Sequence, residues 1–150
     1  MMYFDHGTVP KDETYGYVLI PNATADKTDA YAERPDIEIL MQTENVHAVR
    51  ENKLGITALN NLGNTPVTVD GITVEQASSV LVKRDADGTV KVSVMELVTS
   101  IQTVAVSVEQ AAKVKFEQVL EADDNITVEP NDNQIKFTVK TNVADRPRDT

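Results

Sequence analysis

Hydrophobic and polar residues alternate in short runs along most of the chain after residue 36. The alternation is clearest in residues 89–94 (TVKVSV), where every second residue is valine. A period of two places successive side chains on opposite faces of a strand, so one face is buried and the other is wet. The pattern predicts strands at 37–42, 46–50, 54–62, 66–69, 72–74, 79–83, 89–94, 101–108, 113–119, 125–129 and 134–140.

Turn residues separate these runs. Asp70 and Gly71 stand between two β-branched runs, which is the strongest short signal for a hairpin. A second hairpin is predicted around residues 85–88, and a third around residues 130–133. Residues 108–120 fit neither period cleanly, and a helix is the alternative there. Many short strands with frequent turns predict an all-β, antiparallel sandwich or barrel.

The first 35 residues have a different pattern. Residues 15–20 (YGYVLI) are rich in β-formers and are followed by Pro21, so we predict a strand that ends there. Residues 24–34 predict the one short helix, with Thr24 as its N-cap. Pro35 ends this helix, because proline disfavours the helical conformation in the residue before it. Pro35 is also the best candidate for a domain boundary.

Composition excludes several classes of function. The net charge is -10, with 24 acidic and 14 basic residues, which argues against a nucleic-acid partner and against direct gripping of an acidic polysaccharide. No apolar run is long enough to span a membrane. The first twelve residues, MMYFDHGTVPKD, do not resemble a signal peptide, so we expect a secreted parent to carry its signal elsewhere.

The sequence offers no candidate catalytic residue. It has no cysteine and no G-x-S-x-G motif. His6 follows Asp5, but neighbours in an extended chain point to opposite sides, so we interpret His6 as structural or solvated. His47 lies in a predicted strand, and we expect it on the partly exposed face.

Acidic residues raise the possibility of a calcium site. Asp85 and Asp87 have the spacing of the first two ligands of an EF-hand loop, but Val90 stands where the loop needs glycine. The simpler interpretation is a hairpin turn. We likewise interpret Glu121, Asp123 and Asp124 as a solvated loop. We therefore expect no metal and no cofactor.

Aromatic platforms for sugar binding are scarce. The chain has no tryptophan, and aromatic residues make up 5% of it. Tyr15 and Tyr17 alternate in the first predicted strand, where core or interface positions are more typical than a sugar platform.

Three segments together resemble polysaccharide lyase family 8, which contains hyaluronate, chondroitin and xanthan lyases. They are DHGTVPKDETYGYVLIPNAT (5–24), AYAERPDIEIL (30–40) and NVHAVRENKLGITALN (45–60). The order and spacing of the segments carry the resemblance, and residues 61–150 fit by strand pattern alone. Asn61 and Leu62 depart from it, because family members often carry an aromatic pair there.

The resemblance implies the C-terminal part of a secreted, extracellular lyase that degrades uronic-acid-containing glycans by β-elimination. Residues 1–35 would be the end of the central β-sandwich plus a linking helix, and residues 36–150 the C-terminal β-sandwich. The family's catalytic residues belong to a helical domain whose motifs are absent here, so the chain itself would be an inactive support for the preceding domains. The alternative is an accessory carbohydrate-binding module.

The same assignment predicts an exposed strand edge. If the partners of strand 15–20 lie in the preceding domain, the strand exposes unpaired backbone groups or an apolar patch. A homodimer through this edge is the expected consequence.

Overall fold

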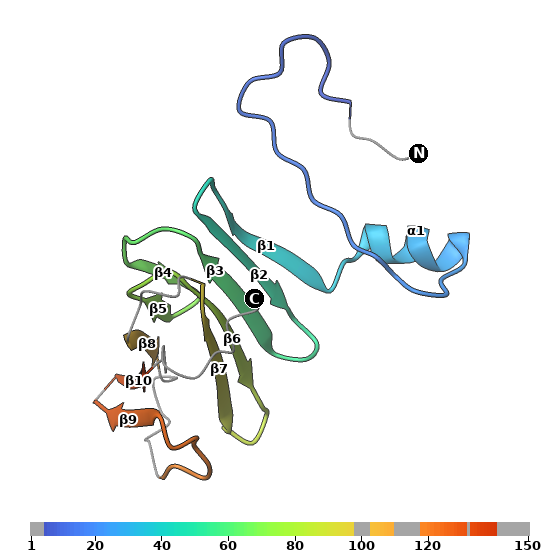
Figure 1. The fold of residues 1–150 in the computed structure, drawn as a ribbon. Coiled ribbons are helices and arrows are strands. Elements are labelled where there is room, and N and C mark those ends of the chain that lie inside the picture. The colour runs from blue at the N-terminus through green and yellow to red at the C-terminus, as the bar shows by residue number, and fades with distance from the viewer. Residues whose placement is uncertain (1–4, 98–102, 110–117, 132, 141–150) are drawn as a thin grey trace, which may run out of the picture. The chain divides into compact units, whose positions relative to one another are not determined.

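The computed structural model describes residues 5–97, 103–109, 118–131 and 133–140. The chain divides into two compact units, Met1–Pro35 and Asp36–Thr150. In the described residues, one helix lies in the first unit and ten strands lie in the second (Figure 1). The fold class is therefore the predicted one, all-β and antiparallel with one short helix near the N-terminus.

The first unit contains an extended segment followed by helix α1 (Ala25–Glu33). Thr24 caps the helix as predicted, because its hydroxyl accepts a hydrogen bond from the Lys27 amide at 3.4 Å. Asp26 lies in the first turn, where a negative charge suits the helix dipole.

The predicted strand at residues 15–20 is not formed. These residues are extended but belong to no sheet. A strand forms only where a neighbouring strand pairs with its backbone groups, and within the described residues no sheet ladder includes this segment. The extended conformation agrees with the sequence pattern, whereas the ladder requires a partner that the pattern cannot specify.

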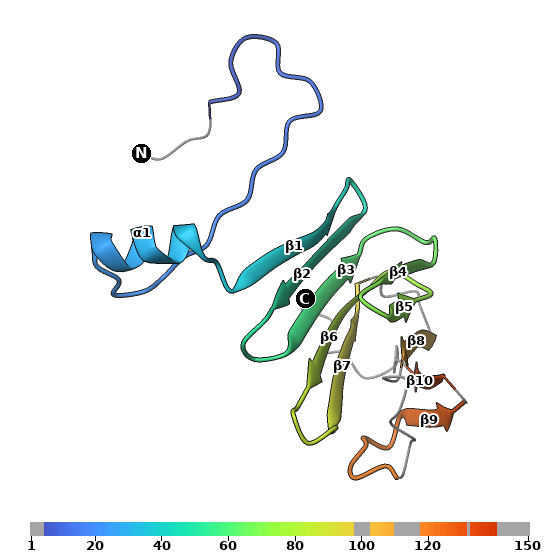
Figure 2. The ribbon, with the colours of Figure 1, turned by 180° about the vertical axis from the view of Figure 1, so that it is seen from behind.

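The second unit contains two five-stranded sheets (Figures 1 and 2). Sheet A has the order β1-β2-β3-β6-β7, and sheet B has the order β4-β5-β8-β10-β9. All pairings are antiparallel. The strands are β1 (Ile37–Gln42), β2 (Val46–Glu51), β3 (Ile56–Asn61), β4 (Val67–Val69), β5 (Ile72–Val74), β6 (Ser78–Arg84), β7 (Val90–Glu96), β8 (Thr103–Glu109), β9 (Ile126–Pro130) and β10 (Gln134–Lys140).

Both tight hairpins in the first half of this unit form as predicted. Asp70 and Gly71 have φ angles of 51° and 69°, the left-handed values that a two-residue hairpin turn needs. Gly88 has a φ of 91° in the turn between β6 and β7. Gly55, between β2 and β3, also has a positive φ of 65°, and an added Cβ would lie 2.5 Å from the Arg84 carbonyl oxygen. Only glycine fits this turn without displacing β6.

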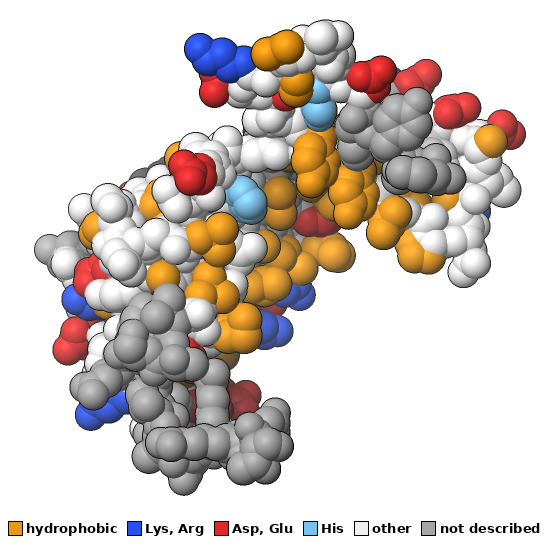
Figure 3. All heavy atoms as spheres, turned by 45° about the horizontal axis from the view of Figure 1, so that its top comes forward, with side chains coloured by type: hydrophobic (Ala, Val, Ile, Leu, Met, Phe, Trp, Pro, Cys, Tyr) orange, Lys and Arg blue, Asp and Glu red, His pale blue; other side chains and the backbone are white. Residues whose placement is uncertain are grey.

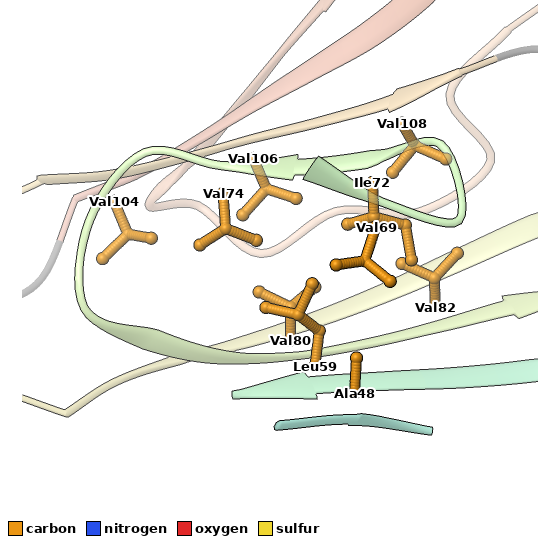
Figure 4. Close-up of a cluster of buried hydrophobic side chains, with 10 residues drawn as sticks. All are labelled: Ala48, Leu59, Val69, Ile72, Val74, Val80, Val82, Val104, Val106 and Val108. Atoms are coloured by element: carbon orange, nitrogen blue, oxygen red, sulfur yellow. The ribbon is translucent and has the colours of Figure 1, made fainter. Parts of the chain in front are cut away.

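The core lies between the two sheets and consists largely of valine. In Figure 4 the side chains of sheet A and sheet B point toward one another. Every inward residue is two positions from the next along its strand, which is the alternation that the sequence shows. The buried cluster comprises Ala48, Leu59, Val80 and Val82 from sheet A and Val69, Ile72, Val74, Val104, Val106 and Val108 from sheet B.

Asn61, where the chain departs from the family pattern, is 1% exposed. Its side chain donates to the Thr65 carbonyl at 3.0 Å and accepts from the Gly63 amide at 3.1 Å. The amide group is therefore satisfied although it is buried. Asn61 shapes the loop between β3 and β4, while Leu62 points to solvent.

The remaining strand predictions hold within a few residues wherever the structure describes the chain. The strand predicted at 113–119, and the helix that is its alternative at 108–120, fall mostly on residues 110–117, which lie outside the described residues. Residues 118 and 119 are not in a strand. The polar end expected at 143–150 also lies outside the described residues.

Truncation of Leu59 tests the core. We expect Leu59→Ala to lower the free energy of unfolding by about 2–5 kcal/mol, because it leaves a cavity between the sheets. Leu81→Ala is the matched control, since Leu81 lies on the opposite face of sheet A and is exposed. The control should change stability by about 0.5 kcal/mol or less in this chain. Urea unfolding of both variants measures the difference, and equal losses would contradict the assignment of the core.

Candidate functional site

Within the described residues, neither histidine lies in an arrangement typical of acid–base catalysis. His47 is exposed on β2, on the face of sheet A that points away from the core, as expected. His6 Nδ1 lies 3.8 Å from a carboxylate oxygen of Glu13 in the first unit. The His6 and Glu13 side chains are 29% and 52% exposed, so this contact lies at the surface of the first unit.

Asp85 forms part of a hairpin turn, with its carboxylate held by lysines. Its backbone amide donates to Thr89 O at 2.8 Å, and its backbone carbonyl accepts from Gly88 N at 3.0 Å. The carboxylate lies 2.7 Å from Lys83 Nζ and 3.3 Å from Lys91 Nζ. The hydrogen bond from Lys83 is the main reason that the pKa of Asp85 lies below its ordinary value. Both oxygens of the Asp85 carboxylate are thus paired with ammonium groups.

Asp87 also serves the turn. Its carboxylate accepts a hydrogen bond from the Thr89 amide at 2.9 Å, and this bond is the main cause of its lowered pKa. Glu121, Asp123 and Asp124 are all exposed in the segment before β9. Among the residues that the structure describes, no three His, Asp or Glu side chains gather in a group able to hold a metal ion.

Within the described residues, a polar assembly is centred on Asp70, at the tip of the β4–β5 hairpin. Arg50 of β2 donates from Nη1 to Asp70 Oδ1 at 2.9 Å, and the Thr57 hydroxyl of β3 donates to Oδ2. Arg84 of β6 donates from Nη2 to the Asp70 carbonyl at 2.9 Å, and its Nη1 lies 3.4 Å from Oδ2. We call these four residues the Asp70 cluster. It joins the tip of a sheet B hairpin to three strands of sheet A.

The charges of the Asp70 cluster are paired with one another. Arg50 Nη2 also donates to Glu38 at 2.7 Å, and this bond is the first reason that the pKa of Arg50 is raised. A guanidinium held in this way stays charged and cannot exchange protons near neutral pH. The cluster borders a hollow of about 1260 Å³ whose other walls include Val92, Val128 and Phe137. These paired charges are therefore suited to holding the β4–β5 hairpin tip on sheet A rather than to proton transfer.

Sequence reasoning did not find the Asp70 cluster. It identified the Asp-Gly turn, but the partner arginines are separated from Asp70 by 20 and 14 residues. Neither periodicity nor a short motif reports such pairs, because they follow from how the two sheets pack. The sequence did contain a signal for the position of Asp70, because an Asp-Gly turn requires positive φ angles that fix the direction of the hairpin tip.

Tyr15 and Tyr17 are 57% and 61% exposed in the first unit. Exposure of this size does not match a core position within this chain, so an interface position is the part of the prediction that stays open.

Lys and Arg side chains lie singly or in small groups among acidic ones on the face that Figure 3 shows. Within the described segments, no helix has the length and apolar character needed to cross a membrane.

Replacement of Asp70 tests the cluster. Asp70→Asn keeps a side chain that tolerates a positive φ but removes the charge that pairs both arginines. We expect the free energy of unfolding to fall by about 1–3 kcal/mol, because the partly buried guanidinium groups lose a charged acceptor. Asp124→Asn, in an exposed loop, is the control and should leave the urea midpoint unchanged. An unchanged midpoint for Asp70→Asn would show that the cluster does not fasten the sheets.

The lowered pKa of Asp85 predicts a dependence of stability on pH. A carboxyl group with a depressed pKa in the folded state stabilises the fold above its ordinary value of 3.8, and this contribution disappears as the pH falls through the folded-state pKa. Asp85→Asn should therefore lower the melting temperature at neutral pH and approach the wild type in strong acid. Thermal unfolding of both proteins at several pH values measures this, and a difference that is independent of pH would refute it.

Comparison with known proteins places the chain among the polysaccharide lyases. A profile described as "Polysaccharide lyase family 8, C-terminal beta-sandwich domain" matches residues 38–96, which cover β1 to β7. A xanthan lyase of Bacillus sp. (strain GL1) is 38% identical over 144 residues, covering 95% of this chain and 15% of the relative. A hyaluronate lyase of Thermasporomyces composti is 38% identical over 96 residues, covering 63% of this chain and 12% of the relative.

Among solved structures, a Paenibacillus xanthan lyase matches with a TM-score of 0.72 and 29% identity, covering 83% of this chain and 12% of that structure's chain. The chain thus spans about 15% of the length of the xanthan lyase relative. The resemblance seen in the sequence is confirmed: the chain belongs to polysaccharide lyase family 8 and corresponds to the C-terminal domain of its members.

Proposed function

We propose that this chain is the non-catalytic C-terminal portion of a secreted polysaccharide lyase, and that it supports the catalytic part of that enzyme. In this proposal residues 36–150 are the C-terminal β-sandwich, and residues 1–35 are the end of the central domain plus a linking helix. Helix α1 and Pro35 would then form the connection between the two domains.

The observation that carries the proposal is the extent of the match. The alignment with the xanthan lyase relative covers 95% of this chain but only 15% of the relative. The matching profile is described as a C-terminal β-sandwich domain. Most of such an enzyme therefore lies outside these residues, and a cleft that binds a polymer and performs the chemistry fits that larger part.

The described residues support the same division of labour. His6 lies beside Glu13, the carboxylates of Asp70 and Asp85 are paired with cations, and Arg50 is paired twice. Elimination from a uronic acid requires a base to remove a proton next to the carboxylate and an acid to protonate the leaving oxygen. Groups already engaged in ion pairs serve structure better than this chemistry.

The substrate class follows from the relatives. Curated relatives are named xanthan lyase and hyaluronate lyase. We propose that the parent cleaves a glycan of this uronic-acid-containing type by β-elimination. A polymeric substrate is met outside the cell, so the parent would be secreted.

One observation favours a second candidate, an accessory carbohydrate-binding module. Tyr15 and Tyr17 are more than half exposed and lie two residues apart in an extended segment. Aromatic rings so placed can stack on sugar rings. The acidic balance of the chain, -10, opposes direct binding of an acidic glycan, so we rank this candidate second.

A paired assay tests both candidates. The purified chain is mixed with hyaluronan, chondroitin or xanthan, and the ultraviolet absorbance of unsaturated uronate ends is followed. The same glycans are titrated into the chain by calorimetry, with the full-length parent as the positive control. We expect neither product nor binding from the chain.

Each other outcome has a clear meaning. Binding without product that is lost in a Tyr15→Ala, Tyr17→Ala double variant would favour the carbohydrate-binding module. Formation of product by the chain alone would overturn the non-catalytic assignment.

A further inference from the structure

The middle of the outer face of sheet A differs in polarity from the outer face of sheet B. The pairing registers define rows of directly opposed residues that cross all five strands on each outer face, one such row in sheet B and three in sheet A. In sheet B this row is polar throughout and consists of Thr68, Thr73, Ser107, Lys136 and Glu129. In sheet A the middle row, which we call the apolar row, consists of Ile39, Val49, Ala58 and Leu81 and ends at Ser93 of β7, whereas the rows on either side of it are polar on most of their strands.

The apolar row is exposed. Ile39, Val49 and Leu81 are 54%, 38% and 42% exposed, on three different strands of sheet A. Met95 of β7 extends the patch on the same face and is 56% exposed. Single exposed apolar residues need no explanation, but a continuous row across a sheet does.

The polar row of sheet B is the internal comparison. Thr68 and Thr73 hydrogen-bond to each other through their hydroxyl groups at 2.8 Å, and Lys136 lies 3.7 Å from Glu75. That face has the alternation expected of a sheet with one wet side. Sheet A has the same strand number and the same antiparallel pairing, so the apolar row on its outer face does not follow from the fold.

We infer that the apolar row of sheet A is the surface on which the sandwich packs against the preceding part of its parent lyase. This inference rests on the proposed function and adds the face through which support is given. The occupant follows from the comparisons, because a C-terminal domain that spans about 15% of a relative has the bulk of the enzyme before it. Sheet B, with its polar outer face, then points to solvent.

The edges of sheet A fit this role. The register of β1 against β2 shifts between Ile39 and Met41, which marks an irregularity in this edge strand. Irregular edges oppose the addition of a further strand. The contact is therefore made by the face of sheet A rather than by extending the sheet.

Cysteine labelling tests the inference, because the chain has no cysteine of its own. Leu81→Cys probes the apolar row, and Thr68→Cys probes the exposed polar row of sheet B. Each variant is made in this chain and in the full-length parent, with other cysteines of the parent replaced by serine. The rate of reaction with a maleimide is then measured in both contexts, and Val49→Cys serves as a second probe of the apolar row.

We expect Leu81→Cys and Val49→Cys to react about tenfold or more slowly in the parent than in the chain, because an interface core excludes the reagent. Thr68→Cys should react at equal rates in both contexts. Equal rates for all three probes would overturn the inference. Slow reaction of the apolar-row probes already in the isolated chain would also overturn the inference. The row would then be covered by residues 5–35, or by a second copy of the chain where the rate falls as the protein concentration rises.

One further measurement separates the proposed supporting role from the assignment of the apolar row as its contact surface. The parent lacking these 150 residues is compared with the full-length parent by thermal unfolding. A lower melting temperature together with equal labelling rates would keep the supporting role and reject the apolar row as its surface. An unchanged melting temperature would reject the supporting role itself.

Discussion

Packing of valine-rich strand faces against one another is the interaction on which the rest of this structure depends. Val82 and Leu59 from sheet A meet Ile72 and Val106 from sheet B, and all are fully buried (Figure 4). Because successive side chains of a strand point to opposite faces, burying one face of a sheet commits the other to the outside. Core packing does not constrain the polarity of the outward-facing residues, so their polarity carries information about what surrounds the domain.

The Asp70 cluster adds a polar fastening to this apolar contact. The turn places its carboxylate against Arg50 and Arg84, whose side chains are about one third exposed. Ion pairs at such positions are partly screened, so their contribution to stability is modest beside that of the core. Their geometric effect is larger, because a charged acceptor with several fixed donors sets where the hairpin tip lies on sheet A.

Membership of polysaccharide lyase family 8 changes how the exposed apolar residues are understood. In an isolated domain the row on sheet A and the segment around Tyr15 would be liabilities. The chain corresponds to about 15% of the length of a xanthan lyase relative, and in the contact that we propose the preceding part of the parent would cover the apolar row. The outer row of sheet B is polar, so the same fold can also present a wet surface.

The sequence by itself determined the fold class, the helix at its N-cap and nearly every strand, because alternation, capping and Asp-Gly turns are local signals that read directly on the backbone. It also identified the family through three short segments. Tertiary structure alone decided how the hairpins assemble into two sheets, that Arg50 and Arg84 converge on Asp70, and that Ile39, Val49, Ala58 and Leu81 fall in one row on the outer face of sheet A. Residues 15–20 show the same limit, because their pattern is that of a strand, but a strand exists only where a partner pairs with its backbone groups. Pairing of strands that no short turn connects depends on residues far apart in the chain, and no local pattern contains it.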